Sequence, residues 1–147
     1  MKNISKTIKI TFFLLGFTFT TCQLFAQSPT KSPAELAKGK QFIVDAEIPW
    51  QDLGGGLKRK IMSYDETMMM VKIIFEKGGI GAPHKHVHTQ MSYVESGVFE
   101  VTIGDKKQLL KKGDGYYIPS NVMHGAVCKE AGVLIDMFTP MREDFVK

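Results

Sequence analysis

From Gln41 onward, short apolar runs alternate with turns that contain glycine. In the run Val98–Ile103, three apolar residues alternate with glutamate and threonine, which is the two-residue period of a strand with one buried face. The turns recur about every 8–12 residues, as in all-β sandwiches and barrels. Strands are predicted at 67–75, 90–95, 98–103, 106–110, 116–119 and 133–138. Since no long helical pattern follows residue 40, we predict an all-β fold, a small antiparallel β-barrel in a single domain.

The first 26 residues follow a different pattern. Three lysines and no acid precede an apolar run near residues 10–19, and Leu-Phe-Ala ends at Ala26. This order is typical of a secretory signal peptide. We therefore predict a signal peptide over 1–26, cleaved near Ala26-Gln27.

Two other interpretations of this N-terminal segment remain open. It could be an uncleaved membrane anchor, although threonines and a glutamine dilute the apolar run. It could also be lipidated at Cys22, although Thr21 is a poor fit before a lipidated cysteine. With cleavage, residues 27–40 would form a flexible leader and 41–147 the β-barrel domain. We then expect an exported, periplasmic protein without a membrane attachment.

Composition narrows the class of protein further. The chain has 147 residues, of which 44% are hydrophobic and 23% charged, which suits one folded domain and excludes a disordered chain. The net charge of +4 invites a nucleic-acid partner, but three of the 19 basic residues lie in 1–26. The remaining 16 basic residues nearly balance the 15 acidic ones, which leaves a net charge of +1, so no nucleic-acid partner is expected. Cys128 would be the only thiol after cleavage, which excludes an internal disulfide.

Three of the four histidines lie within five residues. His84 and His86 are alternate residues, so on an extended segment they point the same way and could bind one ion. His124 could be a third ligand and Gln90 a fourth. His88 could instead replace His84 or Gln90, depending on where the chain bends, or the histidines could lie by chance in a surface loop. Imidazole and amide ligands suit one divalent metal ion, which could be Zn, Ni, Fe or Mn.

Two side chains near the C-terminus are candidates for catalysis. Asp136 shares a strand face with Leu134 and Phe138, and a carboxylate buried among apolar residues is costly. Burial would raise its pKa and suit it to proton transfer, although a structural ion pair is the alternative. Arg142 could bind a substrate carboxylate through two hydrogen bonds, or could pair with one of the two acids that follow it.

Two segments resemble known motifs. Residues 78–97 have the spacing of the first cupin motif, with Gln90 where many members have glutamate. Residues 113–124 resemble the second motif, with Asn121 in place of its usual glycine. The resemblance implies the double-stranded β-helix, or jelly roll, of the cupin superfamily. It does not specify a function, because cupins carry many chemistries.

A narrower resemblance covers residues 41–147. The segments 49–56, 84–104, 113–126 and 136–145 are similar to the KdgF family of pectin-degradation proteins. That family implies an enzyme that opens 4,5-unsaturated uronate monosaccharides, the products of pectin or alginate lyases, to linear keto sugars. By position, the implied metal ligands are His84, His86, Gln90 and His124, and the implied catalytic residues are Asp136, Phe138 and Arg142.

The resemblance also suggests roles for these residues. The metal would act as a Lewis acid, Asp136 would move a proton between a sugar hydroxyl and a ring carbon, Arg142 would orient the carboxylate, and Phe138 would form an apolar wall. Another metal-dependent cupin enzyme, such as an oxygenase or isomerase, and a non-catalytic sugar- or metal-binding module remain alternatives. The partners expected are a small sugar acid and a second copy of the chain in a homodimer.

Overall fold

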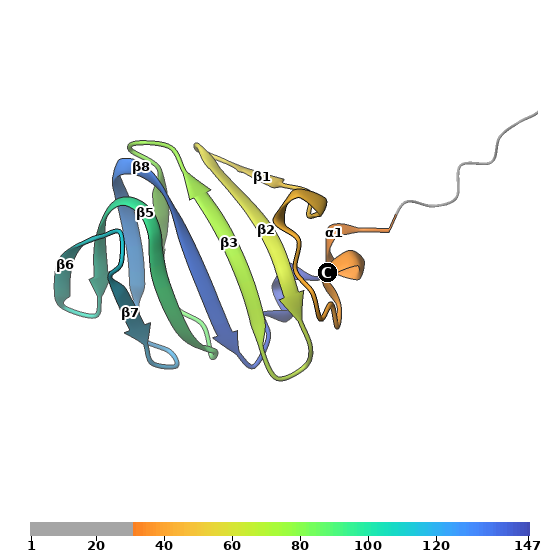
Figure 1. The fold of residues 1–147 in the computed structure, drawn as a ribbon. Helices are drawn as coiled ribbons and strands as arrows, with labels where there is room; N and C mark the ends of the chain where they lie inside the picture. The colour runs from red at the N-terminus through yellow and green to blue at the C-terminus, as the bar shows by residue number, and fades with distance from the viewer. Residues whose placement is uncertain (1–30) are drawn as a thin grey trace, which may run out of the picture.

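Eight antiparallel strands form a curved sheet in the computed structural model, which describes residues 31–147 (Figure 1). The predicted signal peptide and Cys22 lie outside the described residues. The strands are β1 (Gln51–Gly54), β2 (Leu57–Tyr64), β3 (Met69–Phe75), β4 (Ile80–His84), β5 (Thr89–Ile103), β6 (Lys106–Lys111), β7 (Gly115–Ile118) and β8 (His124–Thr139). The helical elements are α1 (Pro33–Ala37) and the 3-10 turns η1 (Asp45–Glu47) and η2 (Glu143–Phe145). The predicted all-β, antiparallel, single-domain fold is confirmed.

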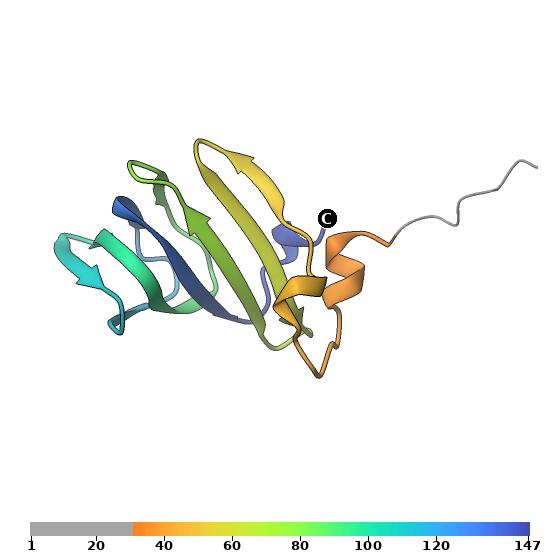
Figure 2. The same cartoon turned by 45° about the horizontal axis from the view of Figure 1, so that its top comes forward.

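The long strands β5 and β8 organise the sheet. They pair along their whole length, from Thr89 opposite Thr139 to Ile103 opposite His124. The first half of β8 also pairs with β4 and its second half with β3, while the first half of β5 pairs with β7 and its second half with β6. Each long strand therefore pairs with different neighbours along its two halves, and the sheet curls around one interior (Figures 1 and 2).

The curl occurs where glycines let the two long strands approach closely. Pairing between β5 and β8 is irregular around Ser96, and Gly97 has a φ of 82°, which favours glycine. A Cβ atom on Gly132 would collide with the backbone of Ser96 and Gly97. The two strands predicted at 90–95 and 98–103 are thus one strand with a bend, because Ser96-Gly97 distorts the ladder without ending it.

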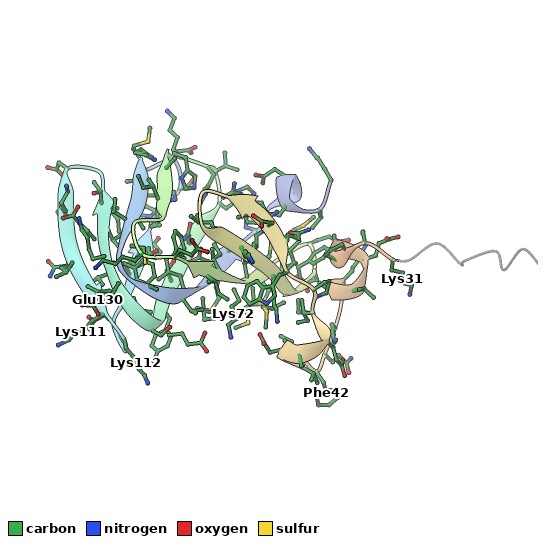
Figure 3. All side chains as sticks on the ribbon, turned by 90° about the horizontal axis from the view of Figure 1, so that it is seen from above. Lys31, Phe42, Lys72, Lys111, Lys112 and Glu130 are labelled. Carbon is green, nitrogen blue, oxygen red and sulfur yellow. The ribbon has the colours of Figure 1, made fainter. Side chains whose placement is uncertain are left out.

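Alternation along the strands places apolar side chains inside. Phe99 and Val101 are buried, as the pattern in 98–103 predicts. Leu134, Asp136 and Phe138 are also buried on one face of β8, as predicted. At the edge of the sheet formed by β6, Lys111 and Lys112 point outward (Figure 3). Charged residues at a sheet edge discourage pairing with another sheet.

Part of the predicted flexible leader is ordered. Ser32 and Glu35 form a reciprocal capping box at the start of α1, and Pro33 occupies the first turn. Ala34 and Ala37 are buried in the same cluster as Ile61 of β2. The packed structure therefore begins before residue 41, where the domain boundary was predicted. No helix within residues 31–147 is long and apolar enough to cross a membrane.

Candidate functional site

A cavity of about 220 Å³ lies inside the curved sheet. Most of its wall is apolar and comes from β2, β3, β5 and β8. Its polar lining residues are Arg59, His84, Gln90, Tyr116, His124, Asp136 and Arg142. The cavity is smaller than the roughly 300–1,000 Å³ typical of sites for drug-sized ligands, which suits a monosaccharide better than an oligosaccharide.

Three histidines meet at the edge of this cavity, from the end of β4, from the loop that joins β4 to β5, and from the start of β8. His84 ends β4 and is the pairing partner of His124, the first residue of β8. His86 follows in the loop, and its ring centroid lies 4.8 Å from that of His124. One nitrogen from each of these histidines lies within 4.8 Å of the others. This geometry could hold one metal ion.

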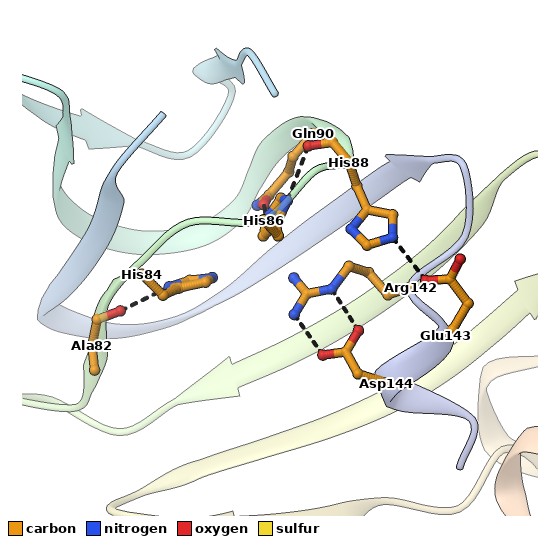
Figure 4. A network of polar contacts seen from close by, with 8 residues as sticks. All are labelled: Ala82, His84, His86, His88, Gln90, Arg142, Glu143 and Asp144. Atoms are coloured by element: carbon orange, nitrogen blue, oxygen red, sulfur yellow. Dashed lines mark hydrogen bonds and ion pairs between the residues drawn. The ribbon is translucent and has the colours of Figure 1, made fainter. Parts of the chain in front are cut away.

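Hydrogen bonds fix the orientation of all three rings. The Nδ1 atoms of His84, His86 and His124 lie 2.8, 3.0 and 2.9 Å from the backbone oxygens of Ala82, His88 and Val122. A carbonyl oxygen only accepts, so each Nδ1 carries the proton and each Nε2 keeps its lone pair. Figure 4 shows this contact for His84. The three Nε2 atoms are therefore ready to bind a cation.

Burial also favours the neutral imidazole, which is the form that binds a cation. Burial lowers the pKa of His124 to about 4 and also lowers the pKa of His86, so both rings are neutral at pH 7. The Nε2 atom of His124 is buried and has no hydrogen-bond partner among residues 31–147. An unpaired buried acceptor is costly, and a bound cation would remove that cost. The donor set thus fits a divalent metal.

Gln90 completes the cluster. Its Oε1 lies 3.1 Å from Nε2 of His86 (Figure 4). Its Nε2 donates to Oγ of Ser92 at 2.9 Å. The bond to Ser92 turns the amide oxygen toward the histidines. Two acceptors, Oε1 of Gln90 and Nε2 of His86, then face each other, and a cation between them would resolve this repulsion. The amide oxygen of Gln90 therefore lies where it could act as a fourth ligand.

His88 is not one of the histidines whose nitrogens converge, although its ring lies 5.5 Å from that of His86. Its ring is buried, and its Nε2 lies 3.0 Å from Oε2 of Glu143, in the C-terminal turn η2 (Figure 4). Its side chain thus ties η2 to the segment that carries His86. The arrangement does not support the alternative in which His88 replaces His84 or Gln90.

Asp136 lies at the inner side of the cavity and is only 5% exposed. Burial raises its pKa to about 6, while hydrogen bonds from Ser92 and Gln90 and the charge of Arg142 oppose the rise. Because the Ser92 hydroxyl accepts from Gln90, its own proton is free to donate to Asp136, at 2.5 Å. A chain of hydrogen bonds therefore connects the candidate metal ligand to the carboxyl group.

Arg142 forms the ion pair that was one of its two expected alternatives. Its Nε and Nη2 donate to the two carboxylate oxygens of Asp144 at 2.9 and 2.7 Å, which is the structural ion pair (Figure 4). Arg142 is nevertheless only 8% exposed and lines the cavity, near the ring of Phe138. Its Nη1 has no hydrogen bond among the described residues, so the end of the guanidinium remains available to an anion.

Three lining or linking residues were not among the predicted site residues. Ser92 and Tyr116 carry no motif of their own, and their roles depend on the pairing of β5 with β7 and β8. Burial and the neighbouring Asp136 raise the pKa of Tyr116, which keeps its phenol protonated. Arg59 lies on β2, a strand that was not predicted. Its two-residue spacing from the apolar residues Leu57 and Ile61, which places all three on one face of a strand, was the one available signal.

The curled antiparallel sheet and the histidine-lined interior define a cupin. The Cupin domain family model matches residues 71–138. A cupin similar to RmlC from Shewanella frigidimarina NCIMB 400 superposes with a TM-score of 0.71 at 44% identity, covering 73% of this chain and 96% of that one.

Two further comparisons place the chain within the superfamily. It is 50% identical over 109 residues to the pectin degradation protein KdgF of Dickeya dadantii (strain 3937), covering 73% of this chain and 99% of the relative. The structure of KdgF from Halomonas sp. superposes with a TM-score of 0.69 at 40% identity, covering 71% of this chain and 98% of that one. The chain belongs to the KdgF family.

Proposed function

We propose that this protein opens 4,5-unsaturated uronate monosaccharides to linear keto acids, a step in the breakdown of pectin- or alginate-type saccharides. One observation carries the proposal. A single monosaccharide-sized cavity brings together a buried acid, Asp136, a guanidinium, Arg142, and a cluster of metal-binding residues. Membership in a family of pectin-degradation proteins supports the same class of substrate.

The cluster of His84, His86, Gln90 and His124 would hold the divalent metal, which supplies a Lewis acid that stabilises negative charge on a substrate oxygen. Arg142 binds the substrate carboxylate through the end of its guanidinium, while Asp144 keeps that guanidinium in place. The sugar ring lies against the ring of Phe138, which forms part of the apolar wall.

Asp136 moves the proton. Its ionised carboxylate takes the proton from the hydroxyl on C1 of the sugar, and the bond between C1 and the ring oxygen breaks to give an aldehyde at C1. The released electron pair leaves an enolate at C5. Asp136 then delivers the proton to C4, which converts the enolate to a ketone. The reaction is an isomerisation with no atom gained or lost, so one residue with a pKa near 6 can serve as base and then as acid.

Loss of the ultraviolet absorbance of the conjugated double bond tests this proposal. Monosaccharides made with a lyase are incubated with metal-loaded protein, with chelated protein and with two variants. Asp136→Asn is expected to slow the decay by about 10²–10⁴-fold, the usual contribution of a proton-transfer group. Asp105→Asn, in the exposed turn after β5, serves as the matched control and should keep the original rate. Wild-type decay no faster than the spontaneous decay would refute the proposal.

A further inference from the structure

An arginine on β2 occupies a position that normally holds an apolar side chain. Arg59 pairs with Ile73 of β3 and lies on the same face as the fully buried Ile61. Its side chain is half-buried and lines the cavity together with Ile73 and Arg142. Burying a cation lowers the stability of the fold unless another group compensates its charge, so the inward position of Arg59 needs a physical reason.

The guanidinium groups of Arg59 and Arg142 contact the same aromatic ring. The Cζ atom of Arg59 is 3.9 Å from the centroid of the Phe145 ring, and that of Arg142 is 4.3 Å from the same centroid. One aromatic ring of η2 thus holds both cations by cation–π contact. Two guanidinium groups on one ring at the cavity wall can converge on one anion.

The two cations are not equally neutralised. Asp144 forms a two-point ion pair with Arg142, whereas Nε of Arg59 donates to the neutral amide oxygen of Gln51 at 3.1 Å. Within residues 31–147, Arg59 has no ion pair with an acidic side chain. Burial lowers the pKa of Arg59, and the charge of Arg142 acts in the same direction, while Asp144 partly opposes them. Arg59 therefore lines the cavity without a carboxylate in direct contact, and an anionic ligand would supply that partner.

We propose that Arg59 is a second carboxylate-binding residue, which acts with Arg142 to select sugar acids over neutral sugars. The inference rests on the proposed function and adds a residue that determines its specificity. Arg59 binds the carboxylate before and during the reaction alike, so its removal weakens substrate binding more than it slows the bound substrate.

Calorimetric binding to the Asp136→Asn protein tests this role without depending on turnover. The ligands are the 4,5-unsaturated uronate and its uncharged methyl ester. Adding Arg59→Gln should raise the Kd of the acid about 10- to 100-fold, the range for loss of a charged hydrogen bond, and should change the Kd of the ester less than about 3-fold. Arg59→Lys, which keeps the charge, should lose less. Lys58→Gln removes a charge from the exposed face of the same strand and should leave both Kd values unchanged.

Three results would overturn the inference: an unchanged Kd for the acid in Arg59→Gln, equal losses for acid and ester, or no binding of the acid while Arg59 is present. If Arg59→Gln does not fold, Arg59→Lys decides the matter through the same comparison of acid with ester. A wild-type protein that binds the acid through Arg59 but does not convert it would count against the proposed function alone.

Discussion

Replacing Asp136 by asparagine should stabilise the fold in a pH-dependent way. The pKa of Asp136 rises from its ordinary 3.8 to about 6 because the group is buried. Well below pH 4 the carboxyl is protonated in both the folded and the unfolded chain, so its burial does not lower the free energy of unfolding. As the pH rises from about 4 to about 6, the unfolded chain ionises first and the wild type loses stability relative to the variant.

The magnitude follows from the two pKa values. A difference of about two pH units corresponds to about 3 kcal/mol at about 1.4 kcal/mol per unit. Above pH 6 the full difference is present and constant. Urea unfolding of both proteins in a chelating buffer, at several pH values from 3.5 to 8, gives the difference in the free energy of unfolding. Any constant effect of the substitution cancels in this pH dependence.

Asp144→Asn provides a control of opposite sign. Its hydrogen bonds with Arg142 lower the pKa of Asp144 to about 2, so the ionised carboxylate stabilises the folded state above about pH 4 and this stability is lost as the pH falls through about 2. The Asp144→Asn variant should therefore be less stable than the wild type at neutral pH. If the Asp136→Asn difference does not grow between pH 4 and 6, the assigned burial of Asp136 is wrong.

Three further outcomes are expected. His124→Ala should abolish stoichiometric metal binding in elemental analysis, whereas His88→Ala should retain the metal; equal loss in both would contradict the ligand assignment. Gly97→Ala should lower the free energy of unfolding by several kcal/mol because its Cβ would lie 2.6 Å from a neighbouring strand, while Gly113→Ala, with open space around it, should cost only about 1–2 kcal/mol in urea titrations. The profile of kcat/KM against pH should fall below about pH 6 as Asp136 takes up a proton, and a flat profile there would exclude it as the base.

The sequence predicted the parts of the fold where alternation is clean. The face shared by Leu134, Asp136 and Phe138 is confirmed, since residues two apart on a strand point to the same side. Strand β2 was missed because Arg59 shares the inward face of Leu57 and Ile61, so that three consecutive cations at 58–60 hide the two-residue period. On the other face, the buried Lys60 contacts Asp45 and the ring of Trp50. A local pattern cannot show that such a charge is neutralised by a distant loop.

The candidate site was predictable in its membership but not in its connections. Histidine spacing and the family resemblance pointed to the four ligand positions, and the structure brings these side chains together. The choice between His88 and its neighbours depended on the chain path between His86 and Gln90, which no spacing rule specifies. The pairing of Ser92 with Asp136 across β5 and β8 depends on strand register, and register is a property of the folded sheet.

The continuous strand β8 limits how related proteins can differ in length. His124 begins this strand, and Asp136 and Phe138 lie near its end, all on inward positions. A single-residue insertion or deletion between His124 and Asp136 would turn one of them to the outer face, because side chains alternate along a strand. Length variation among functional homologues should therefore fall in turns such as the one at Gly104-Asp105. A homologue with an odd insertion inside β8 should have lost either its metal or its acid.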